Sequence, residues 1–109
     1  VNMAQNFRAY TANNVGTSAA TLFTANSYDT VVGIHVTNVH TAAVNVDVYI
    51  NDGSNDIYLG KGMPLPLGGA LQVLGTGKVV VQNGHALKVV SDTAASVDVW
   101  VSAVDDIST

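Results

Sequence analysis

Cysteine and glutamate are both missing from this chain, and charged residues of either sign are scarce. Without cysteine, neither a disulfide framework nor a thiolate metal site can form. All eight acidic residues are aspartate, which favours turns and caps over helix interiors. Charged residues make up 11% of the 109 positions, against about 25% in ordinary soluble domains. Such a surface must consist mainly of Ser, Thr, Asn and Gly, or be partly covered by neighbouring subunits.

Basic residues are scarcer than acidic ones, which argues against nucleic acid as a partner. The chain has four of them, Arg8, Lys61, Lys78 and Lys88, so the net charge is −4. A protein that binds nucleic acid usually gathers basic side chains into a stripe that neutralises phosphates. The scatter of these four residues predicts that nucleic acid is not a partner.

Long apolar runs are absent as well. Gly or Pro interrupts the apolar stretches within a few residues, so none is long enough to span a membrane. The opening "VNMAQNFRAY" lacks the basic region followed by an apolar run that is typical of a secretory signal. We therefore expect no membrane partner, and the length predicts one domain with a single core.

What the chain has in abundance is a period-two alternation of apolar and polar residues. Segments 44–50 and 97–103 place valine, isoleucine or alanine at every second position, and Val32, Ile34 and Val36 are expected to share the buried face of a third strand. This pattern is typical of half-buried β-strands. Nine strands are expected, near residues 7–12, 17–23, 30–38, 44–50, 57–61, 70–74, 78–82, 86–91 and 97–104.

Many short strands separated by frequent turns predict an all-β fold. We expect a single-domain antiparallel β-sandwich, jelly-roll-like, with about eight to nine strands. Residues 1–6 are expected to form a flexible N-terminal segment, and residues 7–109 the sandwich domain.

Two turns carry more specific expectations. The Asn83-Gly84 pair lies between two apolar runs, which predicts a β-hairpin with a type I′ turn. In "NDGSND", acidic and amide residues surround Gly53 and could hold a cation. A calcium loop starting at Asp52 would need a glycine at its sixth position and a glutamate at its twelfth, where Ile57 and Met63 stand. We interpret this segment as a hairpin tip and expect no metal.

Catalytic signatures are weak. His35, His40 and His85 are not spaced as a pair of metal ligands on one strand, and they are expected to be solvated or interface residues. The G-x-S-x-G elbow is absent, and "GTGK" at 75–78 lacks the spacing of a phosphate-binding loop. A Ser-His-Asp triad can be neither recognised nor excluded from spacing alone. The sequence predicts no catalytic residue and no cofactor.

Three rings lie out of phase with the buried rows of their strands: His35, Tyr49 and Trp100. Either the second face of each sheet also packs inside the fold, or the rings form a contact with another subunit or a ligand, where Tyr and Trp are favoured. A sugar platform would use such rings together with converging polar side chains. We predict an interface at these three residues.

The order of motifs from residue 44 onward is distinctive. A V-D-V strand is followed by Tyr58-Leu59 and a lysine, then by Pro64-Leu65-Pro66, a double glycine, "KVVVQNG" and a final V-D-V strand. Together with "NNVGTSAATLFTANSYDTVVGIHVTN" before it, this order resembles small virion structural proteins of tailed phages, especially marine and cyanobacterial ones. His85 departs from the resemblance, at a position where an acidic residue is expected.

The resemblance implies a role in particle architecture and no active-site residues. We expect a capsid decoration or cement protein, located in the virion after assembly in the bacterial cytoplasm. Its partners would be major capsid or tail proteins and further copies of itself, for example in a homo-trimer. The alternatives are a tail, baseplate or fibre-associated protein, a glycan-binding module and, in a different class, a hydrolase.

Overall fold

The computed structural model describes residues 6–25, 29–74 and 77–105, with side chains from Phe7 to Val104. Regular secondary structure in these ranges consists of nine strands, and no helix there could cross a membrane. The strands are β1 (Asn6–Val15), β2 (Ala20–Thr24), β3 (Asp29–Asn38), β4 (Val44–Asn51), β5 (Asp56–Leu65), β6 (Ala70–Gln72), β7 (Val79–Val81), β8 (Ala86–Ser91) and β9 (Val97–Asp105). All nine overlap the strands predicted from the sequence. Most of the proposed N-terminal segment and residues 106–109 lie outside the described residues, while Asn6 already belongs to β1.

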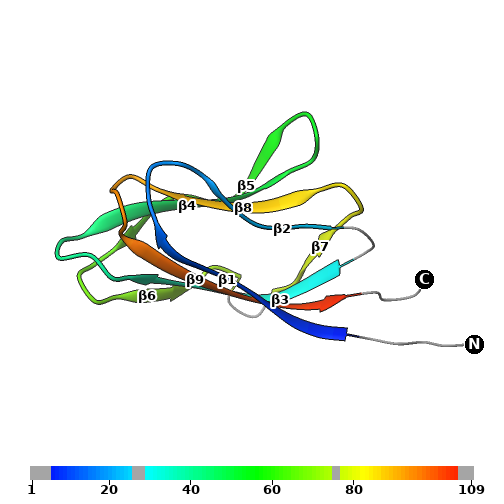
Figure 1. Cartoon of the computed structure of the whole chain (residues 1–109), viewed down its shortest axis with the longest axis horizontal. Helices are drawn as coiled ribbons and strands as arrows, with labels where there is room; N and C mark the ends of the chain where they lie inside the picture. Colours follow the sequence, from blue (N-terminus) through cyan, green and yellow to red (C-terminus); the bar gives the residue numbers. More distant parts are fainter. Residues whose placement is uncertain (1–5, 26–28, 75–76, 106–109) are drawn as a thin grey trace, which may run out of the picture.

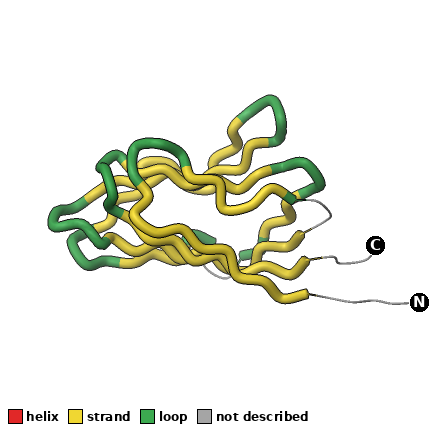
Figure 2. The backbone as a smooth tube through the Cα atoms, in the orientation of Figure 1, coloured by secondary structure: helices red, strands yellow, loops and turns green. Residues whose placement is uncertain are grey.

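The strands form two antiparallel sheets that pack face to face (Figure 1). Sheet A has the order β1-β9-β3-β6, with β7 also paired to β3, and sheet B has the order β2-β8-β4-β5. The connections lie mainly at the two ends of the sandwich (Figure 2). The predicted β-sandwich is confirmed.

With β6 and β7 counted as one edge position, the strand order is that of a jelly roll with four positions in each sheet, in which β4 and β5 form a hairpin within sheet B. The ninth strand arises because one edge position is divided. β6 pairs with residues 35–37 of β3, and β7 pairs with residues 29–31 of the same strand. Both therefore occupy one edge of sheet A, separated in the sequence by residues 73–78.

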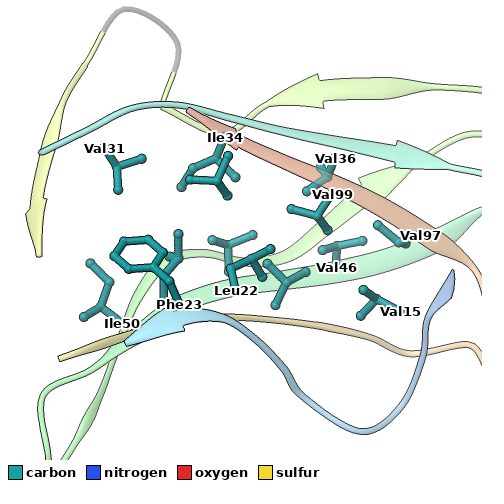
Figure 3. Close-up of a cluster of buried hydrophobic side chains, with 14 of the residues drawn as sticks. Val15, Leu22, Phe23, Val31, Ile34, Val36, Val46, Ile50, Val97 and Val99 are labelled. Carbon is teal, nitrogen blue, oxygen red and sulfur yellow. The ribbon is translucent and has the colours of Figure 1, made fainter. Parts of the chain in front are cut away.

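The core lies between the sheets and consists largely of valine (Figure 3). β-Branched side chains fit a pleated surface well, which explains why so many short valine-rich strands remain extended. Tyr10 of β1 and Phe23 of β2 stack across the two sheets, with ring centroids 4.4 Å apart. Fully buried residues come from both sheets and include Val31, Ile34, Val36, Val46, Val48, Leu87, Val89, Val97 and Val101.

The predicted alternation in β3 is wrong at one position. Val32 is 40% exposed, whereas Val31, Ile34 and Val36 are fully buried. The register against β9 shifts between Val31 and Gly33, which marks a β-bulge. The extra residue reverses the phase of the strand, so Val31 rather than Val32 fills the core.

The predicted hairpin at Asn83-Gly84 is also wrong. The strands on either side do not pair, because β7 belongs to sheet A and β8 to sheet B. Gly84 has φ of 88°, while Asn83 is not among the residues with positive φ. A type I′ turn needs positive φ at both positions, so this combination matches type II instead. The turn carries the chain from one sheet to the other.

The acidic segment after β4 is confirmed as a hairpin tip. Asn51 pairs with Asp56 across the hairpin, and Gly53 has φ of 96°. The Asp52 carboxylate accepts hydrogen bonds from the backbone N–H groups of Asn55 (2.7 Å) and Ser54 (3.0 Å). The polar side chains thus hold the turn itself.

Candidate functional site

The outer faces of the two sheets differ in charge. Among the outward-facing residues that the structure describes on sheet A, Asp98 is the one carboxylate, and none is Lys or Arg. The outer face of sheet B and its protruding β4–β5 hairpin carry Asp47, Asp56, Lys61 and Lys88. Because desolvating charges is costly, sheet A presents the face better suited to contact with another molecule.

Tyr49 belongs to the charged side and is not available for contact. Its side chain is only 8% exposed, because the Tyr58 ring covers it at a centroid distance of 5.2 Å. Lys61 Nζ lies 4.3 Å from the Tyr58 centroid and 4.0 Å from the Asp47 carboxylate. Burial, reinforced by the nearby Asp56, raises the pKa of the Tyr49 hydroxyl above 10.0.

The predicted interface includes both Tyr49 and Trp100, but the two rings do not share one outward surface. The rings lie on different sheets, and Tyr49 is packed within its own sheet's outer layer. Period-two alternation placed both rings opposite the core, but it does not reveal which sheet a strand joins or which neighbour covers a ring.

Trp100 and His35, by contrast, do lie together. They are register partners across β9 and β3, and Thr11 of β1 is the partner of Trp100 on the other side. Directly opposed residues have Cβ atoms about 5 Å apart. Trp100 is 54% exposed, so most of its ring is open to solvent.

An open recess of about 380 Å³ lies beside Trp100. We call it the aromatic recess and define it by its polar and aromatic side chains, which come from three adjacent strands. They are Thr11, Asn13, His35, Thr37, Asp98 and Trp100.

A β-bulge in β1 shapes one wall of the aromatic recess. Between the pairs Ala12–Val99 and Val15–Val97, β1 has two residues where β9 has only Asp98. Asn14 adopts a left-handed conformation with φ of 53°, which asparagine tolerates better than most residues. Its backbone N–H donates to Asp98 Oδ1 at 3.0 Å, and this hydrogen bond fixes the carboxylate at the rim.

The other half of the same face is apolar. One cross-strand row runs from Phe7 through Val104 and Thr30 to Val80, and the exposed Val32 lies on the same side of β3. Phe7 is 79% exposed and Val80 58%. We call Phe7, Val32, Val80 and Val104 the apolar half. The sequence alone does not reveal it, because isolated Phe and Val residues at strand ends give no distinctive pattern.

The three histidines are not brought together. His35 lies in the aromatic recess, His40 follows the end of β3, where its N–H donates to Asn38 Oδ1, and His85 closes the turn before β8. Within the described ranges, no three His, Asp, Glu or Cys side chains are grouped so that they could hold a metal ion.

No protein-family model matches the sequence, and neither does any curated protein. The chain is similar to a solved structure from Bacillus endospore appendages, which are described as disulfide-linked pili. That similarity covers 96% of this chain and 88% of the other, with a TM-score of 0.55 and 12% identity. At this identity the likeness shows the fold alone.

Proposed function

We propose that the protein is a non-enzymatic structural subunit of a tailed-phage virion, acting as a capsid decoration or cement protein. The observation that carries the proposal is the apolar half of sheet A. Exposed apolar patches on a soluble domain mark contacts with other macromolecules. Phe7 alone can bury on the order of 150–250 Å² of surface. At roughly 25 cal/mol per Å², that is worth several kcal/mol before the cost of association.

The size of this surface is better suited to a multivalent contact than to a stable complex between one subunit and one partner. Four strand positions about 4.8 Å apart and about eight residues long give the whole outer face of sheet A an area on the order of 500 Å², of which the apolar half is only a part. A standard stable interface buries about 800 Å² on each partner. A single copy that docks through this face alone would bind weakly, and joining several copies in a homo-oligomer would strengthen the binding.

One further consideration supports a structural role. The Bacillus neighbour is a pilus protein, so the same fold serves as a building block elsewhere. That assembly is disulfide-linked, whereas this chain has no cysteine, so disulfides would not join its copies.

The test uses the double variant Phe7→Ser with Val80→Ser. We expect it to lower binding to particles lacking this chain by at least about tenfold, because two buried apolar side chains are lost. Ile57→Ser, which changes a side chain of similar exposure (54%) on the β4–β5 hairpin, is the matched control. An electron-microscopy map of the reassembled particle would locate the subunit on the capsid or on the tail.

Two results would overturn the proposal. One is unchanged binding of the double variant, since the apolar half would then not be the contact. The other is a map without the chain in the intact particle. Density at the tail, baseplate or fibre would favour the alternative structural role.

A further inference from the structure

The aromatic recess combines an open indole ring with polar side chains from three strands. We propose that it is a carbohydrate-binding site that takes the apolar face of a neutral pyranose. This inference goes beyond the proposed function and does not rest on it, because the recess and the apolar half share no residue.

The ring supplies the first requirement of a sugar site. The face of a pyranose that carries axial C–H bonds is apolar and weakly positive, so it stacks on the negative face of an aromatic ring. Trp100 is 54% exposed, and neither aromatic pair found among the described residues includes it. Its ring is therefore open to a stacking ligand.

The polar side chains supply the second requirement, which is several donors and acceptors directed to one place. The side chains of Thr11, Asn13, His35 and Thr37 take part in no hydrogen bond within the described ranges. Each can donate to or accept from a sugar hydroxyl. They surround the ring on both flanking strands.

Asp98 supplies the strongest acceptor. Its Oδ1 atom receives the Asn14 N–H, and no second partner is found in the part of the chain that is described. Oδ2 therefore remains to accept from a ligand hydroxyl, and hydrogen bonds to a charged acceptor are about twice as strong as neutral ones. The carboxylate and the net charge of −4 both disfavour anionic sugars, so the ligand class is neutral.

The single tryptophan of the chain makes the test specific. Its fluorescence reports on the recess alone. The purified protein is titrated into the millimolar range with maltose, cellobiose, lactose and chitobiose, and in parallel with glucuronate and choline. We expect saturable quenching or a spectral shift with at least one neutral disaccharide, and none with glucuronate or choline.

Variants then assign the contact. Asp98→Asn should weaken binding of that sugar about tenfold, as expected when a charged hydrogen bond becomes a neutral one. Trp100→Ala should abolish binding measured by calorimetry. Phe7→Ser should leave sugar affinity unchanged while it weakens particle binding. Circular dichroism melting of each variant separates loss of the site from loss of the fold.

Three outcomes would overturn the inference: no response to any of the four neutral sugars, a response to choline instead, or unchanged sugar affinity in Asp98→Asn. A response to choline would indicate a site for cations over the ring. Loss of particle binding in Trp100→Ala without any sugar effect would make the recess part of the protein contact. Because Phe7→Ser is scored in both assays, failure of this site and failure of the assembly role are distinguishable.

Discussion

Asn38, at the end of β3, is a buried polar residue whose side chain joins three segments. Its amide nitrogen donates to the carbonyl oxygens of Ala42, Leu65 and Pro66, at 2.9, 3.1 and 3.1 Å, and its Oδ1 accepts the N–H of His40 at 2.8 Å. The side chain is 2% exposed. The bond to Leu65 is buried and the other three are partly buried, so Asn38 holds the loops at that end of the sandwich through backbone groups that are wholly or partly shielded from water.

Asn38→Ala should therefore lower the free energy of unfolding by about 3 kcal/mol, because several wholly or partly buried backbone groups lose their partner. Urea denaturation measures this difference. Thr41→Ala, at an exposed position of the same loop, should cost less than about 0.5 kcal/mol. Equal effects of the two substitutions would contradict this account of Asn38.

A second residue-scale prediction concerns pH. The N–H groups of Asn55 and Ser54 lower the pKa of the Asp52 carboxyl from its usual 3.8. Because the pKa is lower in the folded than in the unfolded chain, the stabilisation is complete above about pH 4 and is lost as pH falls through the folded pKa. The melting temperature of Asp52→Asn should thus lie below that of the parent at neutral pH and approach it at about pH 2. A difference in melting temperature that stays the same at every pH would refute this prediction. Ser54→Ala, which keeps the Asp52 carboxylate, is the control.

At the scale of elements, the sequence predicted which segments form strands but not their irregularities. All nine strands follow from alternation and turn residues, and the hairpin at Asp52 follows from local hydrogen bonding. The bulge at Val32 could not be predicted, because "TVVGIHV" offers two valines and either phase fits a strand. The phase is set by pairing with β9, which is remote in sequence.

The bulge in β3 leads to a direct prediction for two neighbouring valines. Val31→Ala should lower the free energy of unfolding by about 2 kcal/mol, because it leaves a cavity in the core. Val32→Ala should lower it by less than about 0.5 kcal/mol, because that side chain is 40% exposed and lies outside the core. Chemical denaturation of both variants measures the contrast. The reverse order would mean that the strand alternates without a bulge.

The aromatic recess shows the same limit at the site. Alternation alone places Asp98 and Trp100 on one face of β9, and His35 and Thr37 on one face of β3. That these two faces adjoin depends on the order β1-β9-β3, which local pattern does not encode. Tyr49 has the same alternation signal as Trp100, yet its neighbour Tyr58 covers it. Sequence therefore identified candidate rings, and strand order decided which of them can bind.

At the scale of the whole molecule, the main feature is the unequal charge of the two faces. The outer face of sheet B and its hairpin carry Asp47, Asp56, Lys61 and Lys88. The described outward-facing residues of the sheet A strands are apolar or uncharged apart from Asp98, and the exposed Arg8 in β1 and Lys78 just before β7 lie near the ends of those strands. A net charge of −4 makes free copies repel one another at low salt. A contact through sheet A would remove little of that charge from water.

This asymmetry predicts how binding to the particle depends on salt. If docking uses the apolar half, affinity should change less than about threefold between 0.05 and 0.5 M NaCl, because screening acts on charges and not on apolar contact. Placing one charge in the patch, as in Val80→Lys, should lower affinity about tenfold or more, since a charge must then be desolvated. Ile57→Lys adds the same charge on the other side of the molecule and serves as the control. Affinity that falls steeply with salt, with Ile57→Lys as the more damaging variant, would place the contact on sheet B instead.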